Sequence, residues 1–379
     1  MHDPVETGAE YASLIHKEAL MSKVRVGFIG AGRIADLHAL AYAGSPSGEL
    51  YAVADSTPGR AEARARQWGA KRSYVNYQDL LADKNVDAVE VLLPHYLHLP
   101  ATVAALEAGK HVSLQKPMAL SIAEANQMIA AAKKANRVFR VLENFHHYEP
   151  HLRAKAIIES GEIGDPVGVR IKVVGGKAVG GWPIPQESMS WRSEPEKGGP
   201  PGQLFDAGHH HAAMGYFIFG EFERVHAFAD LRQAGVRYLG GAPAMVSWQH
   251  RGGARYGSWQ VTASPEMHVR TRYYSGEDLL EVTGTKGIVW VNRCTADLLG
   301  APPVTVYRDG KICHHSDLET DWGDSFRRGG QAFTDAIANG RAPSLSGTEG
   351  RHILATLFAV IRSATEHREV SIDEIERGA

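Results

Sequence analysis

The first part of the chain alternates short apolar runs with segments of helical periodicity. The apolar runs are rich in β-branched residues and bounded by turn residues, which is typical of buried strands. Strands are predicted at 24–29, 49–54, 87–93, 111–114 and 137–142, and helices at 58–67, 77–82, 100–108 and 122–135. Strands that alternate with helices pair in parallel, so we expect an α/β Rossmann domain with a doubly wound parallel sheet.

From about residue 144 the pattern changes, because strand-like runs follow one another with few helices between them. These runs are 166–174, 224–229, 244–250, 254–262, 268–275, 279–283, 287–291 and 304–307, with helices at 152–159, before 340 and at 348–366. Strands without crossover helices indicate antiparallel pairing. We therefore predict an α+β domain with a large open, mainly antiparallel sheet. A Gly/Pro/Trp-rich stretch at 175–202 predicts a long functional loop.

The length of 379 residues suits two domains. We expect an N-terminal extension at 1–21, a nucleotide-binding domain at 22–145, and a substrate-binding and oligomerisation domain at 146–379. The extension lacks the basic start and the apolar core of a signal peptide. Two interpretations of it stay open, a poorly ordered tail, which we favour, and an arm on a neighbouring subunit.

The turn after the first strand carries a glycine motif. Gly30-Ala31-Gly32-Arg33-Ile34-Ala35 fits G-x-G-x-x-G/A, in which glycines let the backbone approach a diphosphate at a helix N-terminus. Asp55, at the end of the second strand, stands where a carboxylate would hold the ribose 2′-hydroxyl. We expect NAD rather than NADP, because Ser56 and Thr57 offer no cation to a 2′-phosphate. Arg33 and Arg60 are cations that bear on this preference.

Composition narrows the class of protein further. The net charge of −2 provides no basic field for nucleic acid or anionic lipid. No apolar run approaches the roughly 18 residues of a membrane helix. Only two cysteines are present, Cys294 and Cys313. They exclude a disulfide framework, so we expect a cytoplasmic enzyme.

Three further stretches follow predicted strands at the edge where open α/β sheets bind ligands. They are 93–98, 114–117 and 143–150, and 204–210 and the pair Trp191-Arg192 lie beyond them. With the glycine motif, these stretches resemble the glucose–fructose oxidoreductase, inositol dehydrogenase and rhizopine catabolism (Gfo/Idh/MocA) family of NAD(P)-dependent enzymes. The resemblance implies a substrate site between the two domains and a homo-oligomer, a dimer or tetramer, formed through the C-terminal sheet.

The resemblance also implies catalytic roles for Lys116, Asp206 and His210. In such enzymes the lysine orients the reacting hydroxyl, the histidine takes its proton and the aspartate positions substrate. Asp206 and His210 are four residues apart in a helical pattern, which puts them on one face. Gln115 replaces the glutamate that usually precedes the lysine, so the electrostatics of the family cannot be assumed here.

The run His209–His211 invites a metal interpretation. Adjacent helical residues point about 100° apart and zinc spacings are absent, so we expect no metal site. His209 is the alternative base. Ala213 stands where many members of the family it resembles carry an aspartate, so the substrate contact of that aspartate is not carried over to this chain.

The remaining site predictions are contacts to cofactor and substrate. For the cofactor we expect Gly30, Gly32, Arg33, Ile34, Asp55, Pro94, His95, His98, Gln115, Lys116 and Asn144. A purely structural role for His98 is the stronger interpretation. For the substrate we expect Lys116, His146, Tyr148, Trp191, Arg192, Asp206, His209 and His210.

The predicted reaction is oxidation of a secondary alcohol on a sugar, cyclitol or related cyclic polyol by hydride transfer to NAD. Three alternatives stay open. One is a dehydrogenase of a non-sugar ring diol, such as an aromatic cis-dihydrodiol. The second is a redox-neutral enzyme that cleaves glycosides with bound NAD, for which Tyr148, His147 and His95 are candidate second bases. The third is a nucleotide sensor without catalysis, which intact Lys116, Asp206 and His210 argue against.

Overall fold

Two sheets organise the structure, a computed structural model that describes residues 23–183, 185, 190–200, 203–229, 231 and 243–378. The predicted extension at 1–21 lies outside these residues. The first sheet has six strands in the order β3-β2-β1-β4-β5-β6, and every pairing is parallel. Its strands are β1 Val24–Ile29, β2 Gly48–Ala54, β3 Arg72–Tyr74, β4 Ala88–Val91, β5 His111–Gln115 and β6 Phe139–Leu142.

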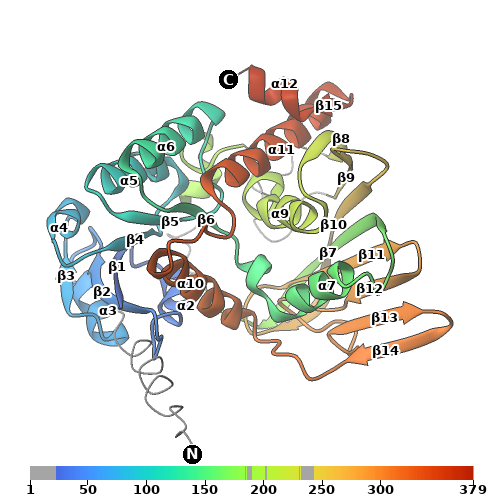
Figure 1. The fold of residues 1–379 in the computed structure, drawn as a ribbon, viewed down its shortest axis with the longest axis horizontal. Helices are drawn as coiled ribbons and strands as arrows, with labels where there is room; N and C mark the ends of the chain where they lie inside the picture. The colour runs from blue at the N-terminus through green and yellow to red at the C-terminus, as the bar shows by residue number, and fades with distance from the viewer. Residues whose placement is uncertain are drawn as a thin grey trace, which may run out of the picture.

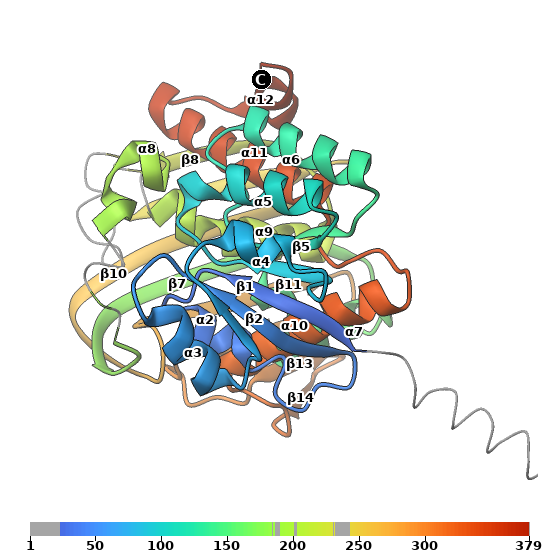
Figure 2. The same ribbon diagram turned by 90° about the vertical axis from the view of Figure 1, so that its left-hand side faces the viewer.

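The helices of this region cover both faces of the parallel sheet, which confirms the doubly wound architecture. They are α2 Ala35–Ala39, α3 Arg60–Trp68, α4 Tyr77–Ala82, α5 His98–Glu107 and α6 Ile122–Ala135. α5 and α6 lie side by side (Figures 1 and 2). α6 begins where predicted, because the Ser121 side chain accepts a hydrogen bond from the Glu124 backbone N–H. β3 was not predicted, since two of its three residues are exposed and the third is half-buried, so the strand carries no apolar pattern.

The second sheet has nine strands in the order β14-β13-β12-β11-β7-β10-β9-β8-β15. It is mostly antiparallel, and β7 and β10 form a parallel pair at its centre. The strands are β7 Pro166–Gly180, β8 Phe222–Ala229, β9 Ala244–His250, β10 Tyr256–Thr271, β11 Gly276–Gly284, β12 Gly287–Val291, β13 Val304–Arg308, β14 Lys311–His315 and β15 Val370–Ser371. The predicted α+β class is therefore correct.

Two boundaries in this sheet differ from the predictions. The runs 254–262 and 268–275 are largely one strand, β10, with a register shift between Ser264 and His268. β7 continues to Gly180, so the predicted loop begins later than residue 175. Both differences have one cause. β7 pairs with β10 from Gly168 to Gly180, opposite Tyr256 to Thr271, and this backbone pairing keeps both strands extended past their predicted ends.

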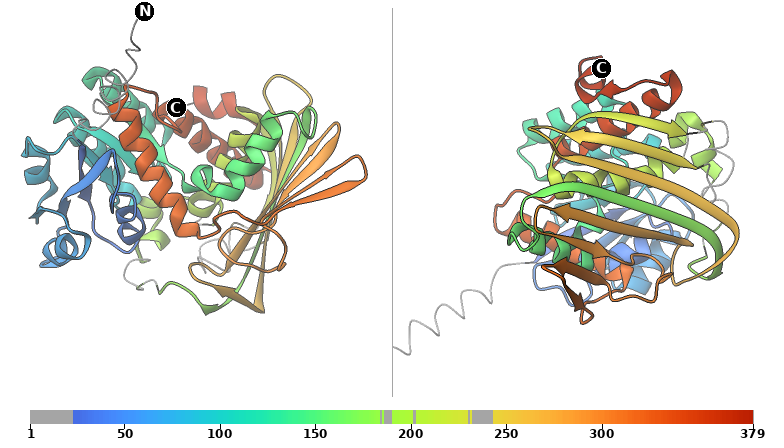
Figure 3. Two further views of the ribbon diagram at one scale, coloured as in Figure 1. Left: turned by 60° about the horizontal axis from the view of Figure 1, so that its bottom comes forward. Right: turned by 90° about the vertical axis from the view of Figure 1, so that its right-hand side faces the viewer.

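Helices cover one face of the nine-stranded sheet and leave the other bare (Figure 3). The remaining helices are α7 Glu149–Glu159, α8 Pro195–Gly198, α9 Gly208–Phe219, α10 Trp322–Ala338, α11 Gly347–Glu366 and α12 Ile372–Arg377. α10 packs against α2, β1 and β2, and α11 contacts α6 and β6 (Figure 1). The end of the chain thus joins the two sheets. Within the described residues, no helix is long and apolar enough to cross a bilayer.

Candidate active site

A cleft of about 500 Å³ lies between the carboxyl edge of the parallel sheet and the covered face of the nine-stranded sheet. Its first wall is formed by the loops that follow β1, β2, β4, β5 and β6. Its second wall comes from β7, β10, β11 and the start of α9. This is where open α/β sheets bind ligands. The strand order reverses beside β1, between β2 and β4.

The glycine loop at one end of the cleft fits a dinucleotide. Gly30 has a φ of +99°, and a Cβ there would lie 2.4 Å from the Leu92 carbonyl oxygen. Only glycine therefore allows the turn to pack against the end of β4. A Cβ on Gly32 would meet nothing within 4 Å, so this position leaves open space beside the backbone for a diphosphate.

Asp55 lies beside this loop at the end of β2. Its Oδ2 accepts a hydrogen bond of 2.9 Å from the Ala31 backbone N–H, and its Oδ1 accepts one of 2.8 Å from Thr57. The Nη1 of Arg60 lies 3.7 Å from Oδ1 of the same carboxylate. Arg33 points elsewhere, because its guanidinium lies 4.2 Å from the centre of the Trp182 ring and contacts Asp36. The glycine loop and Asp55 together offer the donor and acceptor set that NAD requires.

Lys116 follows β5 and binds the residue that leads into α9. Its Nζ donates to the Oδ1 of Asp206 at 2.7 Å and to the Asp206 carbonyl oxygen at 2.9 Å. Arg192 donates through Nε to Oδ2 of the same carboxylate at 2.9 Å. Burial alone would raise the pKa of Asp206, but the charges of Lys116 and Arg192 hold it well below its usual value. The carboxylate is therefore ionised between two cations.

Asp206 lies in a π-helical turn, Gln203–Ala207, that precedes α9. The sequence predicted a continuous helix with Asp206 and His210 on one face. Both side chains do reach the cleft, but each has its own set of partners.

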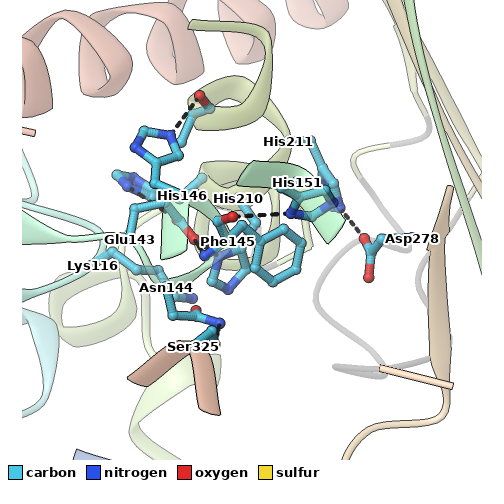
Figure 4. Close-up of polar contacts among 12 residues, drawn as sticks. Lys116, Glu143, Asn144, Phe145, His146, His151, His210, His211, Asp278 and Ser325 are labelled. Atoms are coloured by element: carbon cyan, nitrogen blue, oxygen red, sulfur yellow. Dashed lines mark hydrogen bonds and ion pairs between the residues drawn. The ribbon is translucent and has the colours of Figure 1, made fainter. Parts of the chain in front are cut away.

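His210 is bound to a carboxylate that the predictions did not single out. Its Nδ1 lies 2.8 Å from Oε1 and 2.9 Å from Oε2 of Glu143, the residue after β6 (Figure 4). Its ring stacks on Phe145, with centres 4.4 Å apart and an angle of 11° between the planes. An imidazole that donates from Nδ1 to a carboxylate carries its lone pair on Nε2. Nε2 has no hydrogen-bond partner among the described residues, and His210 lines the cleft.

The electrostatics of this pair favour neutral histidine and ionised glutamate. Burial lowers the pKa of His210, and the charge of Glu143 partly opposes that shift. Burial of Glu143 would raise its pKa, but the hydrogen bond from His210, and the charge that this ring carries once it is protonated in acid, outweigh burial and hold the pKa well below its usual value. The arrangement is that of a base oriented by a buried carboxylate.

The other two histidines of the run have separate surroundings. His209 is fully buried, and its Nε2 lies 3.7 Å from Glu143. His211 Nε2 lies 2.7 Å from Oδ1 of Asp278 on β11. Among the described residues, no group of three His, Cys, Asp or Glu side chains is arranged to hold a metal ion.

Gln115 is linked to a buried carboxylate. Its Oε1 accepts from the Lys116 backbone N–H at 2.8 Å, and its Nε2 donates to His38 Nε2 at 3.1 Å. His38 Nδ1 then binds Glu90, which also accepts from Tyr42. An amide suits position 115, since it donates to the unprotonated nitrogen of His38 and accepts from the backbone at once. In this hydrogen-bonded chain the negative charge is therefore carried by Glu90, because residue 115 is a neutral amide.

Several predicted contacts lie away from the cleft wall. His146 is buried with Nε2 at 2.9 Å from the Ala213 carbonyl oxygen and its ring stacked on Phe217. Tyr148 is 1% exposed and points to Thr320. His98 joins the carbonyls of Pro117 and Leu93, each at 2.9 Å. Neither these three side chains nor that of buried His209 lines the cleft, because adjoining helices and loops cover all four. Their contacts to cofactor and substrate stay predictions, and their burial favours packing roles.

The other predicted residues lie on the cleft: Gly30, Gly32, Arg33, Ile34, Asp55, Pro94, His95, Gln115, Lys116, Asn144, Trp191, Arg192, Asp206 and His210. His95 donates from Nδ1 to the Gly198 carbonyl oxygen at 2.9 Å, and Asn144 donates from Nδ2 to the Ser325 hydroxyl oxygen at 2.9 Å. Glu143 and Asp278 were missed. Glu143 had a signal, since it follows a predicted strand at the binding edge. Asp278 had none, because it stands alone in an ordinary strand sequence.

Two family models match this chain. The model described as "Oxidoreductase family, NAD-binding Rossmann fold" matches residues 24–143, and the Gfo/Idh/MocA C-terminal domain model matches residues 151–290. The chain is 28% identical to 1,5-anhydro-D-fructose reductase of Ensifer adhaerens, covering 92% of this chain and 98% of that protein. It is 26% identical to myo-inositol 2-dehydrogenase of Thermotoga maritima, covering 93% and 99%.

Solved structures share the fold. An oxidoreductase from Agrobacterium radiobacter, crystallised with NAD⁺, L-tartaric acid and magnesium, superposes with a TM-score of 0.78 at 22% identity, over 93% of this chain and 99% of that one. At this identity the likeness supports the architecture. The cofactor follows from the family model over residues 24–143, which describes an NAD-binding domain, as the glycine loop predicted.

The position of Asp55 predicts a preference for NAD over NADP. Asp55→Ala should weaken NAD use and relax the preference, because it removes the acceptor for the ribose hydroxyl and frees Arg60 for a 2′-phosphate. The measurement is kcat/KM with each dinucleotide. Glu62→Ala, an exposed carboxylate on the same helix as Arg60, is the control and should change nothing. A wild-type preference for NADP would contradict the assignment.

Proposed function

Because the chain belongs to the Gfo/Idh/MocA family of oxidoreductases, we propose that it is an NAD-dependent dehydrogenase that oxidises a secondary alcohol of a sugar, cyclitol or related cyclic polyol. The relatives that span nearly the whole chain are named for an anhydro-sugar and for an inositol. The observation that carries the proposal is the convergence of Lys116, Asp206 and the His210–Glu143 pair on one cleft.

The proposed roles follow from the contacts. His210 accepts the hydroxyl proton at Nε2, since Nδ1 is occupied by Glu143. Lys116 stabilises the developing negative charge on the substrate oxygen. Asp206, held by Lys116 and Arg192, fixes the direction of the ammonium group. Bound NAD supplies the hydride acceptor, and Gly30, Gly32, Asp55 and Asn144 are the residues that would hold it.

The cleft also bears on the alternatives. A redox-neutral enzyme needs a second base beside the substrate. Two of the candidates are turned away, because Tyr148 is buried and His147 contacts Ser344 outside the cleft wall. The third, His95, is engaged by the Gly198 carbonyl, and burial lowers its pKa to about 3. These placements favour the plain dehydrogenase.

The free thiols of Cys294 and Cys313 suit the cytoplasm that we propose for it.

The direct test compares substrate consumed with NADH formed across a panel of sugars, cyclitols and ring diols. We expect one NADH for each molecule oxidised and cofactor that exchanges at every turnover. Many turnovers with one retained NAD and no released NADH would instead establish redox-neutral chemistry.

The base assignment predicts a specific pH dependence. His210 must be neutral to accept a proton, so kcat/KM for oxidation rises as pH increases through its pKa. The midpoint of that rise should lie below about pH 6.5, because burial lowers the pKa of His210. Glu143→Gln should move it to still lower pH by removing a charge that raises the pKa, and should reduce kcat by about tenfold or more.

Variants of the three histidines complete this test. His210→Ala should lose roughly 10²–10⁴-fold in turnover and still bind NAD. His209→Ala and His211→Ala should lose much less turnover. Equal losses at all three positions, or activity removed by a chelator and restored by zinc, would contradict the proposal.

We also propose a homo-oligomer formed through the bare face of the nine-stranded sheet. That face exposes large apolar side chains on neighbouring strands, including Phe228, Met245 and Tyr256, which are 66%, 52% and 55% exposed. Phe228→Glu with Met245→Lys should reduce the mass measured by light scattering to that of one chain. Val75→Glu, at a 66% exposed valine of the first domain, should not. A monomeric wild type would refute the proposal.

A further inference from the structure

The floor of the cleft is built from two rows of residues across β11, β7 and β10. The strand register places Asp278, Val173 and Val261 in one row, and Gly276, Gly175 and Ala263 in the next. All six line the cleft. A Cβ at Gly276 would meet nothing within 4 Å. The row of small residues therefore leaves a shallow, flat space over the sheet. In the neighbouring row, Asp278 is the one charged residue.

That charged member, Asp278, is held in one orientation. Its Oδ1 is 2.7 Å from His211 Nε2, and the His211 ring lies against Trp259 with centres 4.8 Å apart. The other carboxylate oxygen, Oδ2, has no hydrogen-bond partner among the described residues. Figure 4 shows Lys116 and Glu143 on one side of His210 and Asp278 on the other. The proposed base thus lies between two polar ends of the site.

Aromatic rings form the sides of this part of the cleft. Trp191, Tyr274 and Trp322 all line it. Aromatic walls over a flat floor suit the apolar face of a six-membered ring. A carboxylate oxygen at the edge of that floor suits a hydroxyl group, because it accepts hydrogen bonds and repels an acidic substituent.

We propose that Asp278, oriented by His211, binds a second hydroxyl group of the substrate and so restricts the enzyme to neutral ring polyols. The inference rests on the proposed function and assigns the other end of the same site. A ring that lacks this hydroxyl would leave Oδ2 buried without a partner, which is the situation that binding sites reject most strongly.

The test pairs a variant with matched ligands. Wild type, Asp278→Asn and Glu281→Gln are compared, each with myo-inositol, 1,5-anhydro-D-glucitol and their monodeoxy analogues. Glu281 is a carboxylate on the same strand whose side chain faces away from the cleft, toward Arg170 and Trp290. Binding to the enzyme–NADH complex is followed by tryptophan fluorescence, and turnover by NADH formation. Thermal unfolding checks that each variant folds, and Asp278→Ser replaces Asp278→Asn if it does not.

In the wild type, removing one particular hydroxyl should weaken binding roughly 10–100-fold, as expected for a hydrogen bond to a charged group. For Asp278→Asn, the Kd values of the same deoxy analogue and its parent should differ by less than about threefold. This variant has already lost the interaction with the hydroxyl group, so removing that group costs little further affinity. Its Kd for the parent polyol should rise while kcat and the pH profile stay close to wild type. Glu281→Gln should behave as wild type does.

The other outcomes overturn the inference. Equal losses for every deoxy analogue in wild type and Asp278→Asn would show that Asp278 contacts no hydroxyl group. A loss of kcat with unchanged Kd would identify Asp278 as a second base. If polyols bind in a manner that depends on Asp278 but no NADH forms, the proposed function is refuted and this inference is retained. A wild type that neither binds nor oxidises these rings would refute both.

Discussion

The ion cluster around Asp206 is the interaction on which the rest of the site depends. Its carboxylate is 3% exposed and receives Lys116 from the edge of the first sheet and Arg192 from the loop region of the second half. A buried carboxylate is tolerable only where its charge is matched and its oxygens are hydrogen-bonded. The two halves must therefore meet with these three groups in register, and that requirement places the start of α9 against the carboxyl edge of the parallel sheet.

Three histidines in and behind the cleft are each paired with a carboxylate, and these pairs determine the proton positions. His210 faces Glu143, His211 faces Asp278, and His38 faces Glu90 behind the lysine. In each pair the carboxylate engages one ring nitrogen, and the other nitrogen faces a different group, as His38 Nε2 does Gln115. Burial keeps His210 neutral, so a nitrogen lone pair is available at neutral pH beside an ammonium group. The chemistry proposed here needs both groups.

The second sheet contributes shape where the first contributes charge. Its central strands present glycine, alanine and valine to the cleft, and Asp278 is the exception in those rows. A rigid sheet positions groups more accurately than loops do. In the proposed site, substrate choice would therefore rest on the strand register of β7, β10 and β11, and the cofactor contacts on strand-end loops of the other sheet.

Local sequence determined the parallel sheet, the glycine loop and the residues at the strand ends, because periodicity and turn chemistry act over a few neighbouring residues. Gly30, Asp55, Lys116 and Glu143 are placed by strands whose patterns are plain in the sequence. Tertiary structure alone decided which side chains face the cleft and which are buried elsewhere. His146 and Tyr148 share a stretch with Asn144, yet a short helical turn and the packing of α9 and α10 bury them. Asp278 reaches the cleft through pairing of strands about a hundred residues apart. Such pairings depend on the packing of the whole domain, which no local pattern encodes.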